Sequence, residues 1–509
     1  MRPDGDDSEG TQSEGPGHLH SDVAESVRNA VKLGSSLLAT WTVALGVRIL
    51  LPRVLGPVSF GTFQFADSFT TMILVIMSLG VETYIRKEVA TRLGHASDFF
   101  GGALVVRIAI GVAVILVAVW GLGVSGKSAD VQRLVLVLGV AQVLINLNNS
   151  YAALLQARGT VDGLSLVNVV AKLAWGGGII AALVLRGGLL SVAVAMLLAE
   201  TLRTSALVVL ARRHLALRYV VDWRATVAVF IASAPYYVMS LSQMIYARID
   251  VSIMSYLTSD AEVGWYGAAS NIAGVSLLLS PLITWILLPL TSRAGARSDA
   301  ELTTVSRRSM ELILTMALPV SLFMFLGADV IVHDVFGPAY EPALRSLEIL
   351  APLFVLTYAA MVSGTMLIRL ERGWALSCIS VAGAIGSPLL NVWLIPYCAE
   401  RFGPGGAGIG AAITLIAMEL GTTVAMTWLL AGRAFDRRSI ATLSKTCVVC
   451  AVVIAIDHLA APLGAWRLVI DVVLYVTLVV AWGALDLRGM LAFLRGARVQ
   501  GATPTTETA

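Results

Sequence analysis

Long hydrophobic stretches alternate with short polar stretches along almost the whole chain. The hydrophobic runs are about 20 residues long, which is the length of a helix that crosses a bilayer. No stretch shows the alternation of apolar and polar residues that is typical of a membrane β-barrel strand. The pattern predicts an all-α polytopic membrane protein with about fourteen transmembrane helices. Their approximate bounds are 30–52, 60–82, 101–122, 131–154, 163–185, 188–211, 226–247, 265–291, 309–332, 346–369, 374–396, 406–431, 440–458 and 467–487.

The composition excludes an ordinary soluble protein. Of the 509 residues, 57% are hydrophobic and 14% are charged, and the mean hydropathy is +0.81. A soluble domain would be roughly one quarter charged. The polar connections between the predicted helices are too short to hold a soluble domain. The protein is therefore expected to work almost wholly within the membrane.

The basic residues indicate an orientation. With the N-terminus in the cytoplasm, roughly 24 Lys and Arg residues fall on cytoplasmic segments and roughly 9 on outer ones, as the positive-inside rule requires. Residues 1–26 lack the apolar core of a signal peptide and are predicted to be a disordered cytoplasmic tail. Residues 491–509 are predicted to form a second cytoplasmic tail. Both chain ends are thus expected in the cytoplasm.

An internal repeat divides the chain. The string RVLGPVSFGTF, which starts at Arg53, returns in degraded form in ARIDVSIMSYLTSDAEVGWYGAA, which starts at Ala247. LLQARGT from Leu154 and MLIRLERGW from Met366 form a second matched pair, again six predicted helices apart. A parallel repeat of this kind is common in transporters. We predict a six-helix lobe over 27–221, a second over 222–431, two extra helices over 432–490, and a substrate cleft between the lobes.

Several motifs resemble a known family. They are RVLGPVSFGTFQFA from Arg53, RIDVSIMSYLTSDAEVGWYGAA from Arg248, LLLSPLITWILLPLTSR from Leu277, VFGPAYEPALRSLEILAP from Val335 and GPGGAGIGAAI from Gly403. In this order they resemble the polysaccharide-biosynthesis flippases of the multidrug/oligosaccharidyl-lipid/polysaccharide (MOP) superfamily, the Wzx-like O-antigen and exopolysaccharide exporters. The region from Arg48 to Gly61 is also similar by position to the start of the related lipid II flippases, in which an Arg of the first helix faces the cavity.

This resemblance implies a fold and a function. The fold would be two six-helix bundles in the V shape of the MATE transporters, working by alternating access in the inner (cytoplasmic) membrane. The cargo would be a polyprenyl-pyrophosphate-linked oligosaccharide, and membrane lipids, a polysaccharide polymerase and other assembly proteins would be partners. No cofactor, nucleic-acid partner or enzymatic activity is expected.

Cationic residues inside the predicted helices are the candidates for substrate binding. A charge in the bilayer interior is costly and usually faces a cavity or a partner. Arg and Lys donors suit the doubly charged pyrophosphate. The alternatives are local pairing of Arg203 with Glu200, and snorkelling of a charge at a helix end toward the membrane surface. The candidate residues are Arg48, Arg107, Lys172, Arg203 and Arg248.

Acidic residues inside the predicted helices are the candidates for ion coupling. Glu419 has no cation near it in sequence, and an isolated membrane carboxylate can carry a proton. Asp67, Asp250 and Glu200 are further candidates. The four cysteines and the remaining residues suggest no metal site and no catalytic group.

Two other functions remain open at this stage. An ion-coupled multidrug antiporter of the same superfamily would share the fold, although the cationic excess counts against it. A membrane glycan polymerase or ligase would need a sizeable outer loop, and the predicted outer loops are short. The absence of a GxxxxGK[ST] string leaves an ion gradient, or consumption of the product, as the energy source.

Overall fold

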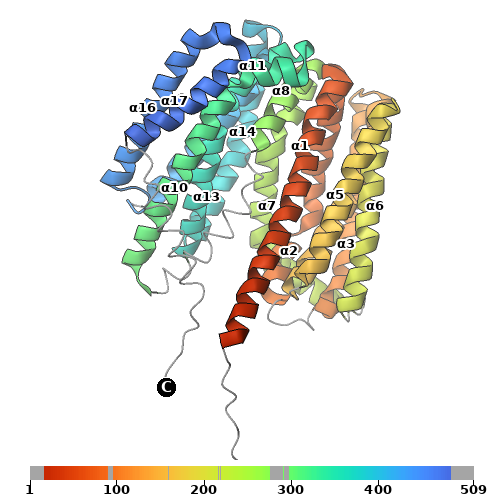
Figure 1. Ribbon diagram of the computed structural model, residues 1–509. Helices are drawn as coiled ribbons and strands as arrows, with labels where there is room; N and C mark the ends of the chain where they lie inside the picture. The colour runs from red at the N-terminus through yellow and green to blue at the C-terminus, as the bar shows by residue number, and fades with distance from the viewer. Residues whose placement is uncertain are drawn as a thin grey trace, which may run out of the picture.

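The computed structural model describes residues 16–89, 96–158, 160–215, 217, 219–275, 291, 297–430 and 432–482. Every regular element in these residues is helical, as Figure 1 shows. The α-helices are α1 (Pro16–Leu74), α2 (Val81–Tyr84), α3 (Ala96–Val124), α4 (Ala129–Ala157), α5 (Val161–Val184), α6 (Gly188–His214), α7 (Trp223–Leu257), α8 (Asp260–Ala273), α10 (Asp299–Leu326), α11 (Ala328–Val330), α12 (Leu344–Leu350), α13 (Leu353–Arg369), α14 (Gly373–Phe402), α15 (Gly406–Leu429), α16 (Arg437–Ala460) and α17 (Arg467–Ala481). Short 3₁₀ or π turns are η1 (Val75–Ser78), η2 (Ile85–Val89), η5 (Ile331–Phe336), η6 (Pro338–Ala343) and η7 (Ala461–Trp466).

The helices are long and apolar enough to cross a membrane. Within the described residues, 11 helices meet this test, or 12 if the two parts of α7, bent by 59° between Ala234 and Tyr236, form one span. Large apolar side chains cover their outward faces, including Trp374 and Trp428, which are 81% and 79% exposed. Such a surface suits lipid rather than water. The protein is a multi-pass membrane protein, and the count is consistent with the predicted fourteen helices, because α1 holds two of them and the segment 265–291 lies partly outside the described residues.

The first repeat motif contains a chain reversal. Gly56 has non-helical backbone angles (φ 73°, ψ 167°) within α1 and divides it into two helices. Glycine adopts this positive φ without strain, and Pro57 is suited to the first position of the helix that follows. Arg48 and Gln64, eight residues to either side of Gly56, line the same cavity. The two halves of α1 therefore lie side by side, as the predicted helices 30–52 and 60–82 require.

Polar residues at the loops start several of the helices. The hydroxyl groups of Ser128, Ser259 and Ser298 accept hydrogen bonds from backbone N–H groups in the first turns of α4, α8 and α10, and the Asp222 carboxylate does so for α7. Each cap satisfies donors that have no partner within the helix. The polar breaks in the hydrophobic pattern thus mark true helix ends.

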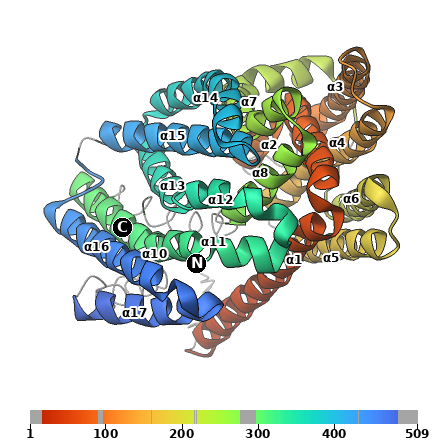
Figure 2. The same cartoon turned by 90° about the horizontal axis from the view of Figure 1, so that it is seen from above.

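The elements form two groups with α7 and α8 between them. Figure 1 shows α3, α5 and α6 on one side of the molecule and α10, α13 and α14 on the other. Figure 2 shows α16 and α17 at the edge, beside α10. Two bundles with two added helices agree with the predicted fold class.

One predicted boundary needs correction. Residues 16–26 were expected in a disordered tail, but α1 begins at Pro16. Proline is tolerated in the first turn of a helix because its missing N–H is not needed there. The predicted tail over 491–509 lies outside the described residues.

Candidate functional site

A cavity of about 540 Å³ lies mainly among residues of the predicted first lobe, with part of its wall from the predicted second lobe. Both halves of α1 contribute, with Arg48 and Asp67 among their residues. Helices α5 and α6 form another wall, and Arg248 of α7 and Asn271 of α8 complete it. The cavity therefore touches both predicted lobes, and a change in their relative position would change its shape.

The cavity collects most of the charged residues predicted from the sequence. Four of the five predicted substrate-binding cations line it, namely Arg48, Lys172, Arg203 and Arg248. Two of the predicted acidic residues, Asp67 and Glu200, line it as well. With all six groups ionised, the cavity carries a formal excess of two positive charges. A dianion would neutralise this excess.

Two of the cations are held by neighbouring groups. Arg48 Nη1 donates a hydrogen bond to the Asn271 carbonyl oxygen, at 3.1 Å, and so joins α1 to α8. Arg203 Nη1 lies 3.5 Å from Glu200 Oε2, and Arg203 Nη2 donates to Asn168 Oδ1 at 3.1 Å. Arg203 and Glu200 therefore pair with each other, which is the alternative to substrate binding that the sequence left open.

The other two cations are more available. Lys172 Nζ lies 3.5 Å from the ring centroid of Trp175, one turn away on α5. Within the described part of the chain, neither Lys172 nor Arg248 makes a hydrogen bond or ion pair with a protein group. Among the residues that the structure describes, Asp67 and Glu200 share the cavity but make no ion pair with these two cations, so both remain open to an anionic ligand.

The two copies of the repeat motif meet at one end of the cavity. A Cβ atom on Gly61 would lie 1.7 Å from the Asp260 carbonyl oxygen, and one on Gly264 would lie 2.0 Å from the Pro57 carbonyl oxygen. The second half of α1 and α8 therefore cross backbone to backbone, which only glycine permits. By the predicted orientation this is the outer end of the molecule.

Polar contacts between the lobes reinforce the same end. Thr62 Oγ1 donates to Asp260 Oδ2 at 3.0 Å, and Tyr340 Oη donates to the Pro52 carbonyl oxygen at 2.8 Å. Lys127 Nζ, between α3 and α4, donates to the Ser255 carbonyl oxygen of α7 at 2.8 Å. These contacts hold the elements of the two predicted lobes together at the predicted outer end in this conformation.

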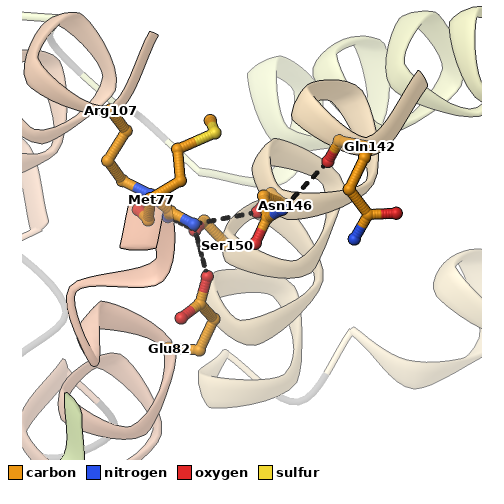
Figure 3. A network of polar contacts seen from close by, with 6 residues as sticks. All are labelled: Met77, Glu82, Arg107, Gln142, Asn146 and Ser150. Atoms are coloured by element: carbon orange, nitrogen blue, oxygen red, sulfur yellow. Dashed lines mark hydrogen bonds and ion pairs between the residues drawn. The ribbon is translucent and has the colours of Figure 1, made fainter. Parts of the chain in front are cut away.

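Arg107 is the exception among the predicted cations. It was expected in the substrate site, but it does not line the cavity, and it is only 1% exposed. Arg107 Nη2 pairs with Glu82 Oε1 at 2.7 Å, and Nε donates to the Met77 carbonyl oxygen at 2.7 Å (Figure 3). A further donor reaches the Ser150 hydroxyl group.

These bonds give Arg107 a structural position. Helix α1 ends at Leu74, and Leu79 and Gly80 adopt left-handed backbone angles before α2 begins. The break leaves backbone carbonyl groups without helical partners. Arg107 bonds to residues on both sides of it. The sequence could not reveal this, because Glu82 lies 25 residues away.

Two of the predicted ion-coupling residues also lie outside the cavity. Asp250 is buried, and its Oδ2 accepts a hydrogen bond from the Tyr266 hydroxyl group. Glu419 lines a second cavity of about 380 Å³ between α7, α13, α14 and α15. Glu419 Oε2 accepts a hydrogen bond from the Tyr246 hydroxyl group at 2.7 Å.

Some cavity residues were absent from the predicted site. Asn168, Trp175 and Ile179 line the cavity together with Lys172. In chain order Asn168, Lys172, Trp175 and Ile179 are four, three and four residues apart, which places all four on one face of α5. This spacing around a membrane lysine was the signal that could have identified them.

The fold and the cavity define a polytopic membrane protein with the two-bundle architecture of a transporter. Residues 26–295 match the family model described as "Polysaccharide biosynthesis protein". The match covers more than half of the chain, and the protein belongs to this family, as the motifs had indicated.

Two curated proteins match a shorter segment. One is the "Probable low-salt glycan biosynthesis flippase Agl15" of Haloferax volcanii, 24% identical over 178 residues, which cover 35% of this chain and 37% of that protein. The other is the "Putative O-antigen transporter" of Escherichia coli (strain K12), 28% identical over 176 residues, which cover 34% of this chain and 40% of that protein. Each match spans less than half of the relative's length.

Solved structures share the fold over most of the chain. A structure titled "Lipid II flippase MurJ, inward closed conformation" has a TM-score of 0.70 and 12% identity, covering 91% of this chain and 100% of that one. An inward-facing multidrug resistance MATE family transporter of the MOP superfamily has a TM-score of 0.61 and 16% identity, covering 77% and 94%. At these identities the likeness establishes the fold alone.

Proposed function

We propose that the protein flips a polyprenyl-pyrophosphate-linked oligosaccharide, such as an O-antigen or exopolysaccharide repeat unit, across the cytoplasmic membrane. The headgroup enters the cavity from the inner side, and the polyprenyl tail stays in lipid. Rocking of the lobes then opens the contact between Gly61 and Gly264 and exposes the headgroup outside. No covalent bond is made or broken, so the protein acts as a transporter and not as an enzyme.

The charge of the cavity is the observation that carries this proposal. A pyrophosphate diester is a dianion, and the cavity has an excess of two positive charges. Arg48, Lys172 and Arg248 offer charge-assisted donors, which are about twice as strong as neutral ones. The names of the curated relatives support the same cargo class.

The size of the cavity supports the same conclusion. Its volume of about 540 Å³ falls within the range of small-molecule sites and is too small for a whole polyprenyl lipid. The apolar part of such a substrate would have to remain in the bilayer. Trp41 and Trp175 also line the cavity and offer apolar rings against which sugar rings could pack.

The alternatives fit the site less well. A multidrug antiporter for cationic drugs shares the fold, but it would require a cavity with an excess of acidic groups. A polymerase or ligase would need a large outer loop to carry its catalytic groups, and the outer connections predicted from the sequence are short. The polymerase and assembly partners implied by the family resemblance belong to the proposal.

Neutralising the available cations should weaken transport. We expect Arg248→Gln or Lys172→Gln to lower the affinity for a lipid-linked pyrophosphate about tenfold or more, because each removes a charge-assisted hydrogen bond. The double variant should lose export almost completely. The measurement is flipping of a lipid-linked oligosaccharide in proteoliposomes, together with binding of the same lipid in detergent.

Arg133→Gln is the matched control, because it removes one positive charge from an exposed position on α4. It should leave both binding and flipping unchanged. Parental flipping by the double variant, at equal amounts of inserted protein, would refute the cationic cavity and with it the proposed function.

Coupling to a proton gradient is a second part of the proposal, and Glu419 is its main candidate. Its cavity is separate from the cationic one and lies within the second lobe. Gln at this position keeps an acceptor for the Tyr246 hydroxyl group but cannot exchange a proton. Asp67 and Asp250 are the remaining candidates, because Glu200 is held by Arg203 and by Asn148 at 2.9 Å.

We expect Glu419→Gln to flip substrate at a rate that no longer responds to an imposed pH gradient, with substrate binding kept. The test compares proteoliposomes with and without the gradient. Glu341→Gln, at an exposed position, should respond as the parent does. An undiminished response in Glu419→Gln would assign Glu419 to packing and leave the cationic cavity unaffected.

A further inference from the structure

A group of charged residues without a role in the cavity lies at the turn between the two added helices. Asp457 is in the last turn of α16, and Arg467 and Asp471 are in the first turns of α17. Asp329 of α11 faces them from the second lobe through Arg467. Three carboxyl groups thus lie around one guanidinium group.

Arg467 accounts for two of the carboxylates. Its Nη2 lies 2.6 Å from Asp329 Oδ2, and its Nε lies 3.1 Å from Asp457 Oδ1. Nη2 also donates to the Leu326 carbonyl oxygen at 3.0 Å, at the end of α10. The Asp329 side chain is 40% exposed, so water can stabilise its charge. Asp457 and Arg467 are 12% and 13% exposed and form a largely buried pair.

Asp471 is left without such a partner. It is 0% exposed, and among the described residues no N–H or O–H group donates to either of its carboxyl oxygens. Arg467 and Asp471 are four residues apart and share one face of α17, so the Asp457 carboxyl that Arg467 holds lies beside Asp471 and is the group able to share a hydrogen bond with it. Two ionised carboxylates only accept hydrogen bonds, so a bond between them needs a proton on one. Asp457 is held as the anion by Arg467, and the proton therefore belongs on Asp471.

The remaining groups near Asp471 offer no compensating charge. The Tyr475 hydroxyl group, one turn along α17, has no hydrogen-bond partner among the described residues. Cys447 and Cys450 of α16 lie near enough to Tyr475 to act on it electrostatically, as does Glu348 of α12 on Asp329. Below them, Val449, Val453 and Val479 pack with Leu322 of α10 in an apolar cluster. Arg467 acts on Asp471 as well, but it already pairs with two carboxylates, so an ionised Asp471 would add a buried negative charge in excess beside an apolar interface.

We propose that Asp471 and Asp457 form a proton-binding site at the turn between α16 and α17. The Asp471 carboxyl carries the proton and donates it in a hydrogen bond to the Asp457 carboxylate, which is paired with Arg467. The bound proton holds the two added helices together, and Arg467 fastens the pair to the second lobe through Asp329 and Leu326. Loss of the proton loosens this end of α17.

Infrared spectroscopy tests the site on the full-length protein. A protonated carboxyl group absorbs apart from a carboxylate, and isotope labelling of aspartate distinguishes it from glutamate. We expect the parent at about pH 5, where an ordinary exposed aspartate is ionised, to show a protonated aspartate band that is absent in Asp471→Asn and retained in Asp130→Asn, an exposed control. Absence of that band in the parent, or its persistence in Asp471→Asn, would overturn the proposal.

Stability provides a second readout. The native parent binds a proton at Asp471 that the unfolded chain releases above about pH 4, so its stability should fall as pH rises from about 4 toward neutrality. The side-chain amide that Asp471→Asn introduces can donate to Asp457 at every pH, so this variant should lack the decline in melting temperature. If it fails to fold, the labelled parent spectrum still decides. Stabilisation of the parent by sodium at constant ionic strength, without a protonated band, would assign the site to a metal cation and refute the proton. Neither readout depends on transport.

Discussion

Replacing Gly61 with leucine is expected to reduce transport to background, because the predicted outer end of the molecule could no longer close. A Cβ atom at this position would lie 1.7 Å from the Asp260 carbonyl oxygen and 2.8 Å from the Gly264 backbone nitrogen. Neither atom belongs to a side chain that can rotate away, so α1 and α8 must separate. Alternating access requires both the closed and the open state, and a variant held open at one end cannot complete the cycle.

Gly46→Leu is the matched control for this prediction. Gly46 lies in the first half of α1, and no atom is within 4 Å of a Cβ atom built there. The same substitution should therefore be tolerated. Flipping in proteoliposomes measures the loss, and labelling of a cysteine at Gln64, a buried cavity residue, by an impermeant reagent measures the opening. Equal flipping and labelling rates in Gly61→Leu and the parent would show that the glycine contact is not a gate.

Replacing Arg107 with methionine is expected to destabilise the protein by about 3–5 kcal/mol, because Glu82 would remain largely buried without its cation. Its carboxylate is 14% exposed. Replacing both residues with methionine should recover most of this loss, since an apolar pair needs no compensation. The measurement is thermal or denaturant unfolding of the purified protein, read as a double-mutant cycle.

Arg133→Met is the control for this cycle. Arg133 and Asp130 form an ion pair at 3.4 Å on the same lobe, with side chains 69% and 91% exposed, and exposed pairs contribute little. Its removal should leave stability almost unchanged. A stable Arg107→Met protein that binds lipid-linked pyrophosphate poorly would return Arg107 to the substrate site, where the sequence had placed it.

The sequence by itself determined that the protein is an all-helical, multi-pass membrane protein of the polysaccharide biosynthesis family. A membrane helix must satisfy its backbone groups internally and face lipid along about 20 residues. This requirement fixes the hydrophobicity of one continuous segment, so it can be recognised in the sequence. The two repeat motifs that contain Gly61 and Gly264 can be recognised for the same reason, because each motif is one short continuous segment of the sequence. For this reason the helical fold, the repeat and the family could be inferred before any contact was known.

Only the tertiary structure decided which charges share the cavity. Membrane helices are apolar on most faces, so hydrophobic periodicity does not reveal which side faces a cavity and which faces another helix. Arg107 and Lys172 look alike in sequence, yet one pairs with Glu82 and the other lines the cavity. The sequence did not single out Asp471 as a functional residue, because its partner Asp457 lies on another helix. Hydrophobic length is a property of a segment, whereas the partner of a buried charge is set by how distant segments pack.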